Sequence, residues 1–127
     1  MANEFSLNVV LRVNKTGVFK GQIGEPVTLS WSGSVASAGS QLISSTTPTR
    51  LNVSDDMLAA GISVFQNKDT TNFIQLGRME SDGFHVEHEI GPKELQTWRP
   101  QSPDIYALAE GADCYLQFLV TEAAAGT

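Results

Sequence analysis

Apolar and polar residues alternate along most of this chain, a pattern typical of half-buried β-strands rather than of helices. In the stretch from Phe5 to Val13, apolar side chains occupy every second position. The same alternation recurs in residues 27–31, 84–90 and 114–120. Turn residues separate the strands about every 8–12 positions, which is the spacing of sandwiches and barrels. We therefore expect an all-β fold, an antiparallel β-sandwich of jelly-roll type.

Three further segments have local signals of their own. Ser54 can cap a first helical turn and Gly61 can end it, so we expect one short helical turn near residues 54–60. Residues 33–40 are rich in serine, alanine and glycine without a periodic apolar face, so we expect a loop there. The Asp-Gly pair at residues 82–83 lies between two alternating stretches and indicates a β-hairpin turn.

The length of 127 residues is that of one domain. We expect a single β-sandwich domain over residues 1–127, with residues 2–7 as a candidate N-terminal arm and residues 123–127 as a frayed tail. The chain is 41% apolar and 17% charged, which excludes a disordered chain of low hydrophobicity. It has no apolar run of about 18 residues, and Met1–Glu4 lacks a basic start and an apolar block. We therefore expect neither a membrane span nor a secretory signal.

Acidic residues outnumber basic ones by 14 to 8, which gives a net charge of −6 at pH 7. Proteins that bind nucleic acid through its phosphates usually have the opposite balance, so we expect no direct nucleic-acid partner. The single cysteine, Cys114, excludes an intrachain disulfide and a multi-cysteine zinc site. Because it alternates with Leu116 and Phe118, we expect a buried and unreactive thiol.

The two histidines, His85 and His88, fall on opposite faces of the strand expected over residues 84–90. We therefore do not expect them to share a metal ion. His88 shares the face that we expect to be buried with the apolar residues of this strand, Phe84, Val86 and Ile90. We interpret His88 as a hydrogen-bonded core or interface histidine, and a pH-sensitive contact is the alternative.

Neighbouring carboxylates occur at Asp55-Asp56 and at Glu80 near Asp82. Acids stabilise the start of a helix and bond to the backbone in turns, so we assign both sets a structural role. No spacing matches a calcium-binding EF-hand loop, and the sequence has no G-x-S-x-G nucleophile motif and no GxxxxGK(S/T) or GxGxxG phosphate-binding motif. We therefore expect no metal, no cofactor and no enzymatic activity.

The two tryptophans have different sequence surroundings. Trp31 shares the apolar positions of its strand, so we expect it in the core. Trp98 lies beside Arg99 at the edge of a loop, which suits either a core plug or an interface anchor, since Trp and Arg are common at binding hot spots. Trp98 and Tyr106 also form the pair that could offer an aromatic platform to a sugar.

The second half of the chain, roughly residues 60–122, resembles a group of small structural proteins of tailed bacteriophages. The likeness lies in short sequence words: Asn67–Gly77 (NKDTTNFIQLG), the turn Gly91–Glu94 with Trp98-Arg99 after it, and the closing stretches Ile105–Ala109 and Ala112–Glu122. These words are not a catalytic signature, and the proteins that carry them are non-enzymatic.

The resemblance implies a virion structural protein, and most specifically a capsid decoration (cement) protein on the outer surface of the capsid. Its expected partners are the major capsid protein and further copies of itself, as a dimer or trimer. Irregular or edge positions suggest the interface residues, namely Phe5, Leu7, Trp98, Arg99 and Tyr106. The alternatives are a neck, tail-completion or fibre-associated subunit of the virion, and a carbohydrate-binding jelly-roll module.

Overall fold

The computed structural model describes the backbone of residues 4–7, 11–15, 19–23, 27–30 and 36–122, and the side chains of residues 36–122. The chain divides into two compact units, Met1–Ser32 and Gly33–Thr127. The expectation of one domain over residues 1–127 stays a prediction. Trp31 and the expected tail at 123–127 lie outside the described residues.

The first unit consists of two antiparallel strand pairs. Strand β1 (Glu4–Leu7) pairs with β4 (Val27–Ser30), and β2 (Leu11–Lys15) pairs with β3 (Phe19–Ile23). The alternating stretch from Phe5 to Val13 thus contributes to two strands, β1 and β2. Phe5 lies opposite Leu29 in the β1–β4 pair.

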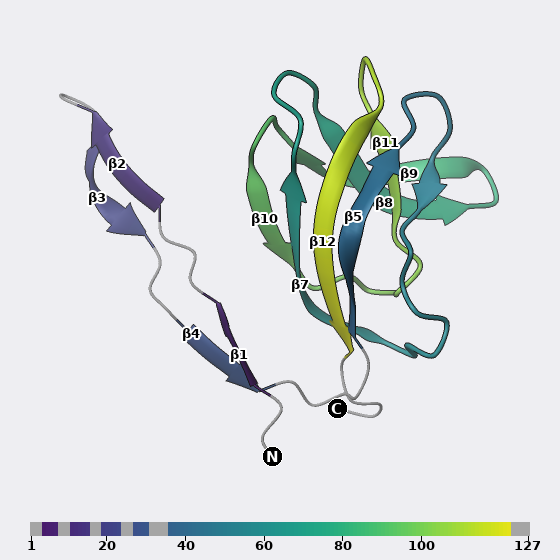
Figure 1. Ribbon diagram of the computed structural model, residues 1–127, viewed down its shortest axis with the longest axis horizontal. Helices are drawn as coiled ribbons and strands as arrows, with labels where there is room; N and C mark the ends of the chain where they lie inside the picture. The colour runs from purple at the N-terminus through teal and green to yellow at the C-terminus, as the bar shows by residue number, and fades with distance from the viewer. Residues whose placement is uncertain (1–3, 8–10, 16–18, 24–26, 31–35, 123–127) are drawn as a thin grey trace. The chain divides into compact units, whose positions relative to one another are not determined.

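The second unit contains two four-stranded antiparallel sheets (Figure 1). The sheet that we call the β12 sheet has the order β10-β7-β12-β5 and consists of β5 (Ala36–Ile43), β7 (Ala60–Asn67), β10 (Leu95–Trp98) and β12 (Cys114–Glu122). The sheet that we call the β8 sheet has the order β6-β11-β8-β9 and consists of β6 (Thr49–Arg50), β8 (Ile74–Glu80), β9 (Gly83–Ile90) and β11 (Tyr106–Ala109). The predicted all-β, antiparallel, sandwich-like fold is confirmed.

The apolar core draws its side chains from both sheets. On β12 the alternation is regular, because Cys114, Leu116 and Phe118 are buried whereas Tyr115 and Gln117 are exposed. The other core residues include members of β5, β7, β8, β9 and β11, namely Ile43, Phe65, Ile74, Leu76, Ile90 and Ala107. The period-two pattern therefore identified the buried face of the last strand correctly.

The described residues contain no helix, so the helical turn expected near residues 54–60 is not formed. The segment makes a β-turn instead, in which the Met57 amide donates to the Ser54 carbonyl oxygen at 3.1 Å. The Ser54 hydroxyl accepts from the Asp56 amide at 3.2 Å, the local bond by which serine favours turns over helices. The chain then enters β7 at Ala60.

The loop expected over residues 33–40 is wrong for its second half, because Ala36–Ile43 forms β5. Every residue from Ala36 to Ile43 has a cross-strand partner on β12. Small residues gave no periodic signal, and the strand is specified by pairing with a segment about 80 residues away rather than by local propensity.

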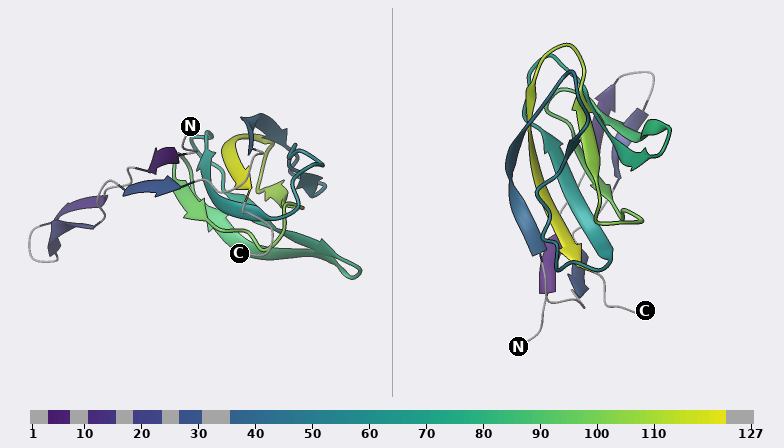
Figure 2. Two further views of the ribbon diagram at one scale, coloured as in Figure 1. Left: turned by 90° about the horizontal axis from the view of Figure 1, so that it is seen from below. Right: turned by 90° about the vertical axis from the view of Figure 1, so that its right-hand side faces the viewer.

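Strands β8 and β9 form the expected hairpin, with Gly83 at a φ of 124° after the turn. Val86 is 49% exposed, so it does not share the buried face with Ile90 as expected. The cause is a bulge: Leu76 pairs with His88, but the next residue, Gly77, pairs with Val86. The extra residue on β9 reverses the alternation of inward and outward side chains from there to the turn. The tip of this hairpin projects beyond the other strands (Figure 2).

Candidate functional site

The strands of the β12 sheet place ten uncharged residues on its outer face, in three cross-strand rows; exposed Lys68, whose amide donates to the Tyr115 carbonyl oxygen at 3.0 Å, follows β7 beside the first row. The first row is Leu42–Tyr115, the second is Ser40–Gln117–Gln66–Leu95, and the third is Ala38–Leu119–Val64–Thr97. We call these ten residues the uncharged face. Their chain neighbours on β12, such as Leu116 and Phe118, point into the core. None of the ten is charged, although the chain carries 22 charged residues.

The uncharged face also exposes large apolar side chains. Tyr115 is 56% exposed, Leu42 is 49% exposed and Leu95 is 46% exposed. Leu119 and Val64, which are cross-strand partners in the third row, are half-buried. Single exposed apolar residues need no explanation, but a contiguous group of them marks a contact surface.

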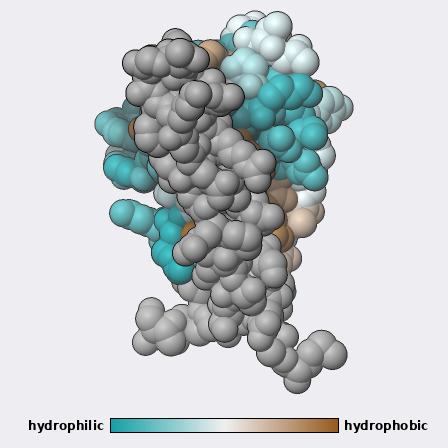
Figure 3. Space-filling model, turned by 90° about the vertical axis from the view of Figure 1, so that its left-hand side faces the viewer, coloured by the Kyte–Doolittle hydropathy of each residue, from teal (hydrophilic) through white to brown (hydrophobic). Residues whose placement is uncertain are grey.

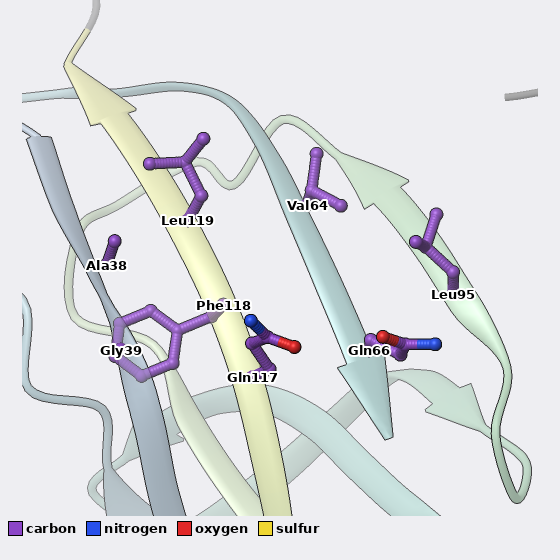
Figure 4. Close-up of a pocket in the computed structure, with 8 residues that line it drawn as sticks. All are labelled: Ala38, Gly39, Val64, Gln66, Leu95, Gln117, Phe118 and Leu119. Carbon is purple, nitrogen blue, oxygen red and sulfur yellow. The ribbon is translucent and has the colours of Figure 1, made fainter. Parts of the chain in front are cut away.

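A hollow of about 390 Å³ lies on this face, between β10 on one side and β5 on the other (Figure 4). Leu95, Val64 and Leu119 supply its apolar lining, and the two glutamines Gln66 and Gln117 supply amide groups. Ala38 and Gly39 leave it open towards the β5 edge, because neither has a long side chain. The hollow holds no titratable or nucleophilic side chain, so its shape and chemistry suit contact rather than catalysis.

The outer face of the β8 sheet is different. Arg50 donates from Nη2 to an oxygen of Asp104 at 2.8 Å, and Gln75 donates to Glu110 at 2.7 Å. Glu89, opposite Gln75, is exposed. In Figure 3, which shows the molecule from another side, the coloured surface is mostly hydrophilic (teal) with smaller hydrophobic areas (brown). The two sheets of the sandwich thus present chemically distinct outer faces.

The structure places Trp98 against the core rather than on an open platform. Its ring lies 4.4 Å from that of His88 and 5.9 Å from that of Phe65, measured between centroids. His88 in turn is bonded from Nδ1 to the side-chain amide nitrogen of Gln96 at 2.6 Å. His88 is therefore a half-buried, hydrogen-bonded histidine, as predicted, and Trp98 closes the core at the end of β10.

The remaining interface candidates are not gathered into one site with Trp98. Arg99 is exposed, and it directly follows β10, which is an edge strand of the β12 sheet. Tyr106 belongs to β11 in the β8 sheet, where it pairs with Arg50 and Gly77. Phe5 and Leu7 lie in β1 of the first unit, and their side chains lie outside the described part of the chain. Their roles as contacts stay predictions.

A charged cluster occupies the tip of the β8–β9 hairpin. His85 Nε2 lies 2.7 Å from an oxygen of Asp82, and Arg78 bonds Glu80 at 2.7 Å. The bond and charge of His85 lower the pKa of the Asp82 carboxyl, and Glu80 raises the pKa of Arg78. Ligand atoms of Glu80, Asp82 and His85 lie within 4.8 Å of one another, but all three are surface groups already engaged in these pairs. Their arrangement is explained by the hairpin turn.

Cys114 is buried, as predicted, at the start of β12. Its Sγ donates to the carbonyl oxygen of Ala112 at 3.2 Å. Burial raises the pKa of the thiol, and the nearby acids Asp69 and Asp113 raise it further. The protonated form is therefore favoured, which makes this thiol a poor nucleophile.

No family model matches this chain, and comparison with curated proteins and with solved structures found no match. Among the described residues, none lies in a helix long and apolar enough to span a membrane.

Sequence reasoning missed the uncharged face because its residues come from four strands that are distant in sequence. Two of its members, Ala38 and Ser40, fell in the segment expected to be a loop. A signal was nevertheless present: on 114–120, the positions between the apolar residues are Tyr115, Gln117 and Leu119, none of them charged. On a strand with one solvated face, charged residues are expected at such positions.

Proposed function

We propose that this protein is a non-enzymatic structural subunit of a bacteriophage particle, and specifically a capsid decoration protein that binds the outer surface of the major capsid shell. The observation that carries the proposal is the uncharged face, a broad protein-contact surface without catalytic groups. The sequence resemblance over roughly residues 60–122 indicates that the particle is a tailed bacteriophage.

The order of the strands supports the finer assignment of a jelly roll. If the strands β5 to β12 are numbered 1 to 8, the β12 sheet has the order 1-8-3-6 and the β8 sheet has the order 2-7-4-5. Two interlocked Greek keys are expected to give this order. Jelly rolls occur in viral capsid proteins and in lectins, so the topology suits the virion proposal and also its carbohydrate-binding alternative.

The net charge supports a position on the outside of the shell. A chain with a net charge of −6 is repelled by packaged nucleic acid, so an exterior site costs less electrostatic energy than an interior one. Many weakly bound copies on one shell gain from multivalency, so each contact need not be large. If the protein binds the assembled shell and not the free capsid subunits, its binding stabilises the shell by mass action.

The direct test is cryo-electron microscopy of particles made from the genome that encodes this chain. We expect density for the eight-stranded sandwich at regular positions over the outer surface of the shell. Density confined to the neck, tail or fibres would replace decoration by the alternative of a neck, tail-completion or fibre-associated subunit. Absence of the chain from purified particles would overturn the virion proposal.

A carbohydrate-binding role is favoured by a second, smaller hollow of about 230 Å³ beside Trp98. Arg78, Glu87 and Asp104 contribute polar groups to its wall, and Trp98 contributes an aromatic surface. Tyr106 does not line it, so the expected pair of aromatic residues does not form this site. The role predicts binding on a glycan array that is lost in Trp98→Ala, and an array without binding would remove it.

A further inference from the structure

We propose that the first unit of this chain binds the surface of an anionic lipid bilayer through an amphipathic two-stranded ribbon. The name ribbon stands here for the two strand pairs β1–β4 and β2–β3 (Figure 1). A lipid surface is a partner beyond the proposed function, which rests on the β12 sheet of the second unit.

The two strand pairs of the ribbon share one register. Glu4 lies opposite Ser30 in β1–β4, Lys15 lies opposite Phe19 in β2–β3, and in both pairs the numbers of cross-strand partners add up to 34. Directly opposite residues of an antiparallel pair fall on the same face, and successive residues fall on opposite faces. The register therefore sorts the odd-numbered residues of each pair onto one face and the even-numbered residues onto the other.

The odd-numbered face of the ribbon is almost entirely apolar. Its apolar members are Phe5, Leu7, Val27 and Leu29 in β1–β4, and Leu11, Val13, Phe19 and Ile23 in β2–β3. The two exceptions are Lys15 and Gly21. All even-numbered residues of the four strands are polar or charged, namely Glu4, Ser6, Arg12, Asn14, Lys20, Gln22, Thr28 and Ser30. Each strand pair is therefore amphipathic.

An amphipathic pair of strands needs a surface that covers its apolar face. Among the described strands, no third one pairs with β1–β4 or with β2–β3. Two strands alone are marginally stable in water and gain stability by packing against another surface. Their free edges carry unpaired backbone groups, which exclude them from the hydrocarbon core of a bilayer. The interface of a bilayer meets both demands, because acyl chains cover one face while water reaches the edges.

The charges of the first unit favour an anionic surface. The sequence from Leu11 to Ile23 contains three basic residues, Arg12, Lys15 and Lys20, and no acidic one. The second unit, in contrast, has 5 basic and 12 acidic residues. Basic residues beside an apolar face match headgroup phosphates above acyl chains. Nucleic acid would pair with the basic residues but leave the apolar face uncovered, and soluble acidic proteins rarely expose a long apolar strip.

Sedimentation of the full chain with lipid vesicles tests the inference with a matched pair of variants. Lys20 lies in β3 and Lys68 is exposed in the second unit, so Lys20→Glu and Lys68→Glu change the net charge equally. We expect the wild type and Lys68→Glu to bind vesicles of phosphatidylglycerol and phosphatidylcholine in equal parts, and to bind phosphatidylcholine alone much more weakly. One basic residue strengthens binding to an anionic surface about fivefold, so Lys20→Glu should bind at least about fivefold more weakly.

An environment-sensitive dye on an introduced cysteine tests which face of the ribbon meets the lipid. Val13 and Asn14 are neighbours on opposite faces of β2, and buried Cys114 stays unlabelled. We expect the dye on Val13→Cys to emit at shorter wavelength when the anionic vesicles are added, and the dye on Asn14→Cys to change less. This comparison keeps the inference testable if Lys20→Glu does not fold.

Absence of wild-type binding to the anionic vesicles would overturn the inference. Equal binding of Lys20→Glu and Lys68→Glu, or equal dye responses at residues 13 and 14, would overturn it too. A wild type that binds capsid shells but not vesicles, with shell binding lost in Lys20→Glu, would assign the ribbon to an acidic protein surface instead and leave the proposed function standing. Vesicle binding by a chain that does not bind shells would do the reverse.

Discussion

The buried side chain of Asn67, at the end of β7, donates from Nδ2 to the carbonyl oxygen of Ile90, at the end of β9, at 3.1 Å. This bond joins the β12 sheet to the β8 sheet. The same Nδ2 donates to the Asn72 carbonyl oxygen at 2.8 Å, and Oδ1 accepts from the Asp69 amide at 2.9 Å. One buried amide therefore satisfies three backbone groups and fixes the loop after β7.

Replacing Asn67 with alanine should destabilise the sandwich strongly. Each buried backbone group left without a partner costs about 1–3 kcal/mol, so we expect a loss of about 2–4 kcal/mol in the free energy of unfolding. Urea denaturation measures it. Gln66→Ala, one residue earlier and on the outer face, is the control and should change stability by no more than about 0.5 kcal/mol. Equal losses would show that Asn67 has no special role.

Acid should weaken the same loop through Asp69. Its Oδ2 accepts from the amides of Thr71 and Asn72, at 3.0 and 2.6 Å, and these bonds lower the pKa of the carboxyl from 3.8. The native chain then takes up this proton at lower pH than the unfolded chain does, so the stabilisation is complete above the ordinary pKa. It is lost as the pH falls through the native pKa.

We therefore expect the urea midpoint of the wild type to fall between about pH 5 and pH 3, and that of Asp69→Asn to fall less. Asparagine keeps one oxygen acceptor but does not titrate. Parallel pH profiles for the two proteins would contradict the assignment.

Replacing either of two strand glycines, Gly77 or Gly39, with alanine should change the stability of the protein, and the two changes should have opposite signs. A Cβ at Gly77, beside the bulge, would collide with the carbonyl oxygen of His85, whereas a Cβ at Gly39 meets nothing within 4 Å. We expect Gly77→Ala to destabilise by about 1–3 kcal/mol. We expect Gly39→Ala to stabilise by about 0.4–1 kcal/mol, because it restricts the unfolded chain without native strain. Thermal melts of both variants check the signs, and a tolerated Gly77→Ala would count against the bulge.

The thiol of Cys114 should react only when the sandwich opens. It is 1% exposed and its pKa is raised by burial. In the native state the thiol is therefore both protonated and inaccessible to the reagent. Labelling with a disulfide reagent at pH 8 should be slow in buffer and fast in denaturing urea. Rapid labelling in buffer would mean that the start of β12 is open.

Regular alternation made several elements predictable from sequence. The buried row of Cys114, Leu116 and Phe118 and the hairpin at residues 82–83 follow from period-two patterning and turn chemistry, which are local. The strand at Ala36–Ile43 and the bulge opposite Leu76 could not be predicted, because distant pairing partners create them. The uncharged face could not be predicted for the same reason, because Leu119 and Val64 become neighbours only when β12 pairs with β7.

Binding of the purified chain to shells that lack it tests the central claim, the proposed contact of the uncharged face with a capsid shell, most directly. Leu119→Glu adds a charge to the uncharged face, and Leu108→Glu adds the same charge at a half-buried position of β11 in the β8 sheet. We expect the wild type and Leu108→Glu to sediment with the shells, and Leu119→Glu to bind at least about tenfold more weakly. Circular dichroism of both variants checks that the sandwich is intact. Equal binding of the two variants, or no binding of the wild type, would contradict contact through the uncharged face.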